Sequence, residues 1–118
     1  MALFKSRHSK ARDDAQKEMK DLLMADEQIE HTFPLEEEYI ALTSYRVVLV
    51  DQSLSGGGVQ QLLSLPYSRL TGIALSRTSG GKHRADMELL TGSRRIRFTL
   101  FKKDDAPELY KALMRKLA

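Results

Sequence analysis

The stretch YIALTSYRVVLVDQ, residues 39–52, places two apolar runs on either side of the four-residue segment Thr43–Arg46. Both runs are rich in β-branched, aromatic and aliphatic residues, so their spacing predicts two strands joined as a hairpin. Within the turn, Thr43 and Ser44 can hydrogen-bond their own backbone, and Arg46 can reach a neighbouring carbonyl or carboxylate. We therefore interpret this polar segment as a structural corner rather than a reactive centre.

The residues before this hairpin predict a helix and one further strand. From Lys10 to Met24 the composition favours a helix. Its apolar residues recur at helical spacing on one face: Ala11, Ala15, Met19 and Leu22. QIEHTFP, residues 28–34, alternates in polarity and ends at a proline, as a short strand does. Residues 1–9 are basic, with little to bury, and are expected to form a flexible tail.

The residues after the hairpin predict four more strands separated by glycine-containing turns. The turns are DQSLSGGG (51–58), SGGK (79–82) and TGS (91–93). The strands are expected within VQQLLSLP (59–66), LTGIALSRT (70–78), RADMELL (84–90) and RRIRFTLF (94–101). The last of them alternates most cleanly, with Ile96, Phe98 and Leu100 predicted to face the core.

The final residues predict an amphipathic helix over residues 105–117. Asp105 can cap it, Glu108 follows three residues later, and a proline at 107 is tolerated in a first turn. Leucines recur every four residues at Leu109, Leu113 and Leu117, with Tyr110 and Met114 beside them. This stripe requires a large apolar surface to cover it.

The order of elements defines the predicted fold class as mainly β, or α+β by content. Seven short strands over residues 28–101 follow one another without intervening helices, so the sheet should be antiparallel. That many strands must curl into a barrel or form a sandwich to hide their apolar faces. We expect the C-terminal helix to cap the open end, and residues 10–118 to form a single domain with its N-terminal helix at 10–24.

Composition restricts the chemistry. The 118 residues include no cysteine, which excludes disulfides, thiolate chemistry and a Cys-based zinc site. No stretch approaches the roughly 20 apolar residues of a membrane span, and the first residues lack the apolar run of a signal peptide. These features favour a soluble cytoplasmic protein. Charge is segregated: residues 21–41 hold seven acidic residues and no Lys or Arg, whereas residues 42–103 hold ten basic and three acidic ones.

Two segments of the chain resemble a known family. ALTSYRVVLVD, residues 41–51, is similar to the strand-turn-strand segment of the bacterial pleckstrin-homology-like family, which is in turn related in appearance to GRAM domains. SLPYSRLTGIAL, residues 64–75, is similar to that family's Pro-Tyr segment between the fourth and fifth strands. The resemblance covers about residues 18–117. It implies a PH-like barrel closed by one C-terminal helix. It also implies association into ring-like homo-oligomers, and the ligands of the family are generally unknown.

The residues offer no catalytic or metal centre. The three histidines, His8, His31 and His83, lie in the tail, in a strand and in a turn, and no serine occupies a nucleophile elbow. His31 and its neighbour Glu30 would point to opposite faces of their strand, so they cannot chelate one ion. We predict no enzymatic activity, no cofactor and no metal. Basic residues interleaved with exposed aromatics are also missing, so no nucleic-acid partner is expected.

Two charged groups are the candidate contact residues. Arg94, Arg95 and Arg97, around the last strand, could meet an anionic partner such as an acidic peptide or a lipid surface. Glu36, Glu37 and Glu38 occupy the loop where lipid-binding proteins of the resembled fold carry basic residues, which disfavours phosphoinositide binding. We interpret these acids as a contact to another subunit.

The sequence therefore predicts a non-catalytic PH-like interaction module that forms homo-oligomers and binds a protein or peptide partner. Segregated charge agrees with self-association, because the acidic first hairpin of one subunit could face a basic strand of another. Exposed edge strands offer a second route. Two alternatives stay open: a peripheral membrane module that binds anionic lipid, and an enzyme.

Overall fold

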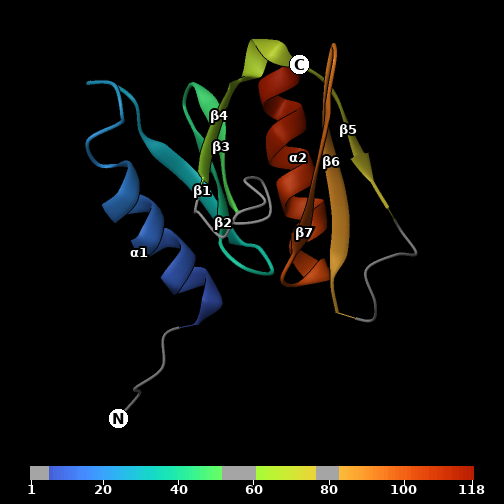
Figure 1. Cartoon of the computed structure of the whole chain (residues 1–118), viewed down its shortest axis with the longest axis horizontal. Helices are drawn as coiled ribbons and strands as arrows, with labels where there is room; N and C mark the ends of the chain where they lie inside the picture. Colours follow the sequence, from blue (N-terminus) through green and yellow to red (C-terminus); the bar gives the residue numbers. More distant parts are fainter. Residues whose placement is uncertain (1–5, 52–60, 77–82) are drawn as a thin grey trace.

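Two antiparallel sheets and two helices make up the computed structural model, which describes residues 6–51, 61–76 and 83–118. The first sheet has the strand order β1-β2-β3-β4 and the second has the order β5-β6-β7. Figure 1 shows α1 on the outer side of the first sheet and α2 between the two sheets. The predicted class, a curled antiparallel β structure capped by a C-terminal helix, is confirmed in the form of a sandwich and not of a closed barrel.

The elements follow one another as the sequence predicts. The helices are α1 (Arg7–Met19) and α2 (Ala106–Leu117), with short 3-10 turns at η2 (Tyr67–Arg69) and η3 (Lys103–Asp105). The strands are β1 (Ile29–Pro34), β2 (Tyr39–Thr43), β3 (Arg46–Asp51), β4 (Gln61–Pro66), β5 (Leu70–Leu75), β6 (Ala85–Thr91) and β7 (Arg95–Leu100). The predicted turns at 51–58 and 79–82 fall almost wholly outside the described residues.

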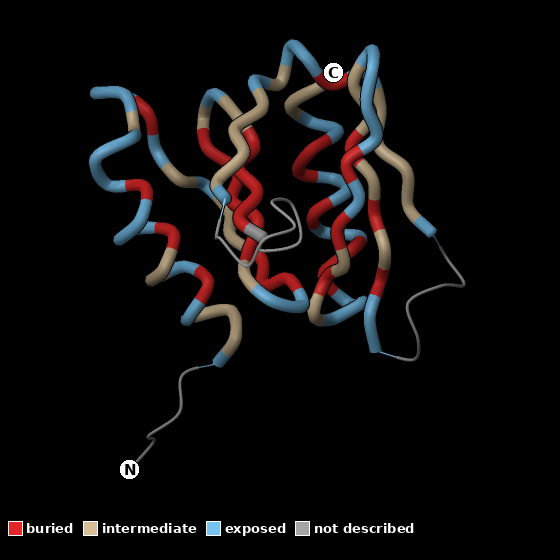
Figure 2. The backbone as a smooth tube through the Cα atoms, viewed as in Figure 1, coloured by how far each residue is buried: buried red, intermediate tan, exposed pale blue. Residues whose placement is uncertain are grey.

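The central strands β2 and β3 are buried on both faces. One face contributes Ile40, Leu42, Val47 and Leu49 to the core between the sheets. The other face packs Tyr39, Ala41, Val48 and Val50 against α1. The helix meets them with its small side chains, Ala11 and Ala15, and with Met19. Figure 2 shows buried residues along the side of α1 that faces the sheet and exposed ones on the other side. Small residues let the helix approach closely, which explains its weak apolar stripe.

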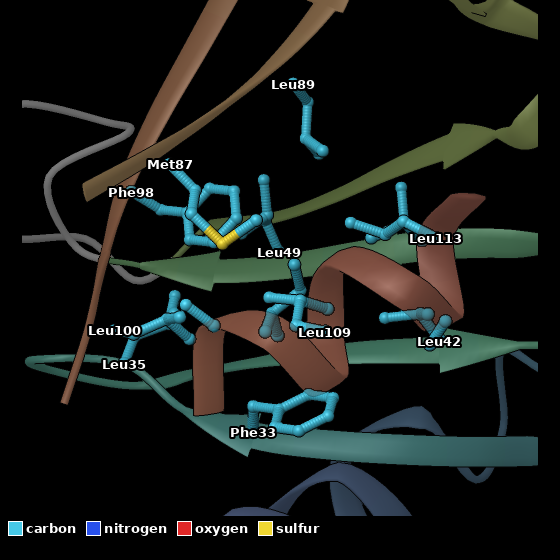
Figure 3. Close-up of a cluster of buried hydrophobic side chains, with 14 of the residues drawn as sticks. Phe33, Leu35, Leu42, Leu49, Met87, Leu89, Phe98, Leu100, Leu109 and Leu113 are labelled. Atoms are coloured by element: carbon cyan, nitrogen blue, oxygen red, sulfur yellow. The ribbon is translucent and has the colours of Figure 1, made fainter. Parts of the chain in front are cut away.

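The main core lies between the two sheets, under α2. Strands β6 and β7 turn alternate residues inward, and Ile96, Phe98 and Leu100 are buried as their alternation predicts. Leu109 and Leu113 of α2 are both 0 % exposed. Figure 3 shows their side chains among those of both sheets, including Phe33 of the first sheet and Phe98 of the second. Burying a leucine contributes roughly 1.5–3 kcal/mol, so α2 is a principal source of stability and not an appendage.

The first and last strands join the two sheets at one corner. Leu35, just after β1, forms an isolated antiparallel bridge with Leu100 of β7. The amide of Glu36 donates to the carbonyl of Thr99 at 2.9 Å, and the amide of Phe101 donates to the carbonyl of Pro34 at 3.1 Å. At the other side, β4 and β5 are each the terminal strand of their sheet. Within residues 6–51, 61–76 and 83–118, the sandwich is thus closed along one side and has two strand edges on the other.

Helix α1 differs from the prediction at both ends, and α2 lacks the predicted side-chain cap. Helix α1 starts at Arg7, within the predicted tail, because the Ser6 hydroxyl accepts from the amide of Ser9 and caps it. It ends at Met19 and not at Met24, so Leu22 is 52 % exposed, contrary to its predicted inward position. Asp105 precedes α2 as expected but makes no side-chain cap. Its carboxylate binds His8 instead, with Nε2 at 2.9 Å from Oδ2.

Candidate functional site

The corner between β2 and β3 is organised around the hydroxyl of Thr43. Its Oγ1 accepts hydrogen bonds from the amides of Tyr45, at 3.1 Å, and Arg46, at 3.0 Å. The same hydroxyl donates to Oε2 of Glu27 at 2.5 Å. The carbonyl of Thr43 accepts from the Tyr67 hydroxyl at 2.7 Å. The predicted hairpin corner between β2 and β3 is confirmed, and the buried acid that completes its hydrogen bonding, Glu27, comes from outside the hairpin.

Glu27 and Arg46 form a two-pronged ion pair beneath this corner. Arg46 Nε lies 2.8 Å from Oε2 and Nη2 lies 2.9 Å from Oε1, while the Glu27 side chain is 0 % exposed. Hydrogen bonding by Arg46 is the main reason that the pKa of Glu27 falls to about 2, and the Thr43 hydroxyl and the Met24 amide add to it against the opposing effect of burial. The carboxylate is thus held charged, and each of its oxygens accepts two hydrogen bonds from the protein.

The rest of the Arg46 guanidinium fastens neighbouring segments to the corner. Nη2 donates to the carbonyl of Leu22 at 2.8 Å, and Nη1 donates to the Ser64 hydroxyl of β4 at 3.1 Å. Within the part of the chain that the structure describes, no buried side-chain nitrogen or oxygen lacks a hydrogen-bond partner. The loop after α1, the hairpin corner and β4 are therefore cross-linked into one rigid frame.

This frame carries exposed apolar side chains on its surface. Leu22 is 52 % exposed, Met24 54 % and Tyr45 40 %. Each is tied to the frame: Leu22 by its carbonyl, Met24 by its amide to Glu27 Oε1, and Tyr45 by its hydroxyl to Asp26. We call these three residues the corner patch. Sequence reasoning missed it because helical spacing placed Leu22 on the inner face of a longer helix.

The predicted basic group at β7 is only partly available to a ligand. Arg95 and Arg97 point to the solvent face, about 70 % exposed, and flank the carboxylate of Glu88 at 3.3 and 3.7 Å. Arg94 is exposed in the preceding turn, where its amide donates to the Thr91 hydroxyl. The three arginines lie at the start of β7 as expected. Their acidic neighbour, Glu88, lies on β6, so the sequence around the arginines did not indicate it.

The predicted acidic loop makes contacts within its own chain. Glu36 pairs with Arg84 at 2.9 Å, and its carbonyl accepts from Arg7. Arg7 also donates to the carbonyl of Leu35 and lies over the ring of Phe101, 4.2 Å from its centroid. One face of this loop thus anchors the start of α1. Contact of Glu36, Glu37 and Glu38 with another subunit stays a prediction.

His8 and His31 both make side-chain contacts within the chain. His8 of α1 contacts the carboxylate of Asp105, the residue before α2. The ring of His31 stacks on the ring of Phe33, with the two centroids 6.2 Å apart. Among the described residues no group of three or more His, Asp or Glu side chains could hold a metal ion. No helix in the same residues is both long and apolar enough to traverse a bilayer.

Comparison with known proteins agrees with this architecture. Residues 2–117 match the family model for the bacterial PH domain. A pleckstrin homology domain from Shewanella amazonensis SB2B superposes with a TM-score of 0.70 at 17 % identity, covering 90 % of this chain and 87 % of that one. A DUF1696-family protein with a pleckstrin-homology domain, from Shewanella loihica PV-4, gives a TM-score of 0.67 at 17 % identity, with 90 % and 96 % covered. No curated protein sequence matches the chain.

Proposed function

The chain belongs to the bacterial PH domain family, and from this premise we propose that it is a non-catalytic interaction module that self-associates and also binds a protein or peptide partner. Its action is docking, with no covalent bond made or broken.

The observation that carries the proposal is the corner patch on its hydrogen-bonded frame. Leu22, Met24 and Tyr45 expose apolar surface although the chain has a well-formed core. Exposed apolar side chains that lie together mark interaction surfaces, and tyrosine and methionine are enriched in the centres of such surfaces. Because Glu27 and Arg46 hold the patch in place, little conformational entropy is lost when a partner covers it.

The polar residues support docking over chemistry. Glu27 is held ionised by hydrogen bonds from Arg46, Thr43 and Met24, and His8 is engaged with Asp105. A general base or nucleophile needs a lone pair that faces substrate, whereas these groups face other parts of the chain. Strand edges add a second kind of contact, because β4 and β5 each have a strand on one side only in the described sheets.

Oligomeric mass tests the proposal most directly. We expect light scattering coupled to size exclusion to give a multiple of the 13.4 kDa chain mass at micromolar concentration. A mass of one chain across the whole range from about 1 to 200 μM would contradict self-association. Co-sedimentation with vesicles that contain phosphatidylserine, at about 0.15 M salt, tests the alternative that the partner is a lipid surface. We expect the protein to stay in the supernatant, since Glu88 lies between Arg95 and Arg97.

A further inference from the structure

Large exposed apolar side chains occur at five positions in the described residues, and they divide between two places. Leu22, Met24 and Tyr45 form the corner patch. The other two are Tyr110, 37 % exposed, and Met114, 40 % exposed, which lie four residues apart on α2 and therefore side by side on one helical flank. We call this pair the helix patch. We propose that the corner patch of one copy docks on the helix patch of a second copy, an inference that rests on the proposed function and names its partner.

The helix patch points away from the side of the molecule that carries the corner patch. Lys116 contacts Glu30 of β1 at 2.7 Å and lies over the ring of Tyr67, so its flank of α2 faces the first sheet. Tyr67 also binds the carbonyl of Thr43, next to the corner patch. Met114 is two residues from Lys116, which is about 200° around a helix. The helix patch therefore projects away from the side on which the corner patch lies, and one molecule cannot bring its own two patches together.

Charge around the two patches is of opposite sign. Residues 21–30 hold four acidic residues and no basic one, while α2 holds three basic residues and one acidic, Glu108. Glu27 is neutralised by Arg46, and Glu30 by Lys116. This leaves Asp21 and Asp26 beside the corner patch, with Lys20 as the nearest basic neighbour in sequence. Lys111 and Arg115 remain on the exposed side of α2.

These features favour a second copy of the chain as the partner that covers each patch. Each patch offers an apolar centre, and the charges beside one patch complement those beside the other, which favours the encounter and sets its orientation. Two copies that meet through different surfaces form a head-to-tail contact, which leaves one corner patch and one helix patch unused. Such a contact propagates from copy to copy until a ring closes or a filament forms.

Variants that remove one patch at a time give the decisive test. The corner variant carries Leu22→Gln and Met24→Gln, and the helix variant carries Tyr110→Gln and Met114→Gln. All four positions are exposed, so the fold should persist, and circular dichroism and the melting temperature verify this for each variant. We expect both variants to run as single chains at concentrations where the wild type is oligomeric. An equimolar mixture should form a dimer, because one intact pair of patches is restored.

Each outcome decides between the two proposals. If the wild type is oligomeric and both variants keep its mass, the patch assignment is wrong while self-association stands. If each variant is monomeric and the mixture stays monomeric, the head-to-tail arrangement is wrong. A wild type that is itself monomeric refutes self-association and, with it, this inference. Gln16→Ser with Lys17→Gln is the matched control, since it changes two exposed residues of α1 that belong to neither patch and should leave the mass unchanged.

Charge reversal tests the electrostatic part. Lys111→Glu with Arg115→Glu should weaken association roughly tenfold or more, because it places acids against Asp21 and Asp26. Mixing this variant with a chain that carries Asp21→Lys should restore part of the loss. If the reversed helix associates as tightly as the wild type at low salt, charge does not select the partner and the inference fails.

Discussion

Arg46 holds the carboxylate of Glu27 through two nitrogens, at 2.8 and 2.9 Å, in a position that water does not reach. Glu27 lies in the loop between α1 and β1, and Arg46 begins β3, so the pair bridges 19 residues of chain. A charge buried in this way must be compensated, and removal of either member leaves the other unpaired. The pair therefore controls both the stability of the corner and the position of the apolar residues above it.

Replacing Glu27 should be costly for the fold. We expect Glu27→Gln to lower the free energy of unfolding by about 3 kcal/mol, because it leaves the Arg46 guanidinium partly buried without a counter-charge. Urea denaturation followed by circular dichroism measures the change. Glu36→Gln is the control, since it removes an exposed pair with Arg84 and should cost within about 0.5 kcal/mol. Equal effects of the two variants would show that the pair is not a stabilising contact.

The same pair predicts how stability depends on pH. The folded-state pKa of Glu27 is about 2, below the value of 4.5 for a free glutamate, so the unfolded chain binds the proton more readily. The contribution of Glu27 is complete above about pH 5 and is lost as the pH falls toward 2. The urea midpoint of the wild type should therefore drop over this range, and Glu27→Gln should show a shallower dependence. Parallel curves for both proteins would contradict the assignment.

The close approach of α1 to the sheet can be broken at one residue. Ala15 is 0 % exposed and packs in the cluster with Tyr39 and Val48. Ala15→Arg should cost at least about 3 kcal/mol, because the helix must move away or bury a charge. Gln16→Arg, on the exposed side of the same helix, should leave the unfolding curve within about 0.5 kcal/mol of the wild type. Hydrogen exchange at β2 should rise in the first variant alone.

Two tyrosines should resist ionisation. Burial raises the pKa of Tyr39, with a further contribution from the Glu18 carboxylate that accepts its hydroxyl. Burial also raises the pKa of Tyr67. In an alkaline titration followed at 295 nm, both should stay protonated past pH 10 and ionise together with unfolding. Tyr39→Phe should remove part of that late step. An unchanged late step would show that Tyr39 ionises in the folded protein.

Local patterns predicted the elements that are buried on one face. Strand β7 alternates because one side meets the core and the other meets solvent, so Ile96, Phe98 and Leu100 could be identified from spacing alone. The leucine stripe of α2 was equally clear, and Leu109 and Leu113 are fully buried. In β2 all five residues are buried, because α1 covers the second face, and this removes the alternation that would reveal which side is which.

Contacts between distant residues could not be predicted in the same way. Asp105 has the sequence context of a helix cap, yet His8, 97 residues earlier, takes its carboxylate. Glu27 is one of seven acidic residues in the segment 21–41, and nothing in the sequence distinguishes it from the others. Its pairing with Arg46 depends on the folded arrangement of the two segments. The corner patch was missed for the same reason. Leu22 is exposed because α1 ends at Met19, and the carbonyl of Leu22 accepts a hydrogen bond from Arg46, which lies 24 residues later.

The bridge between Leu35 and Leu100 has a consequence for the order of folding. It joins the residue after β1, the first of the described strands in the sequence, to β7, the last of them, and Leu109 and Leu113 of the following helix complete the core. A growing chain that has released β1 to β6 cannot close this seam, so it keeps leucine-rich surface open until α2 has left the ribosome. Folding should consequently be slow for the chain's size, and truncation by even two helical turns at the C-terminus should yield an aggregating polypeptide and not a smaller domain.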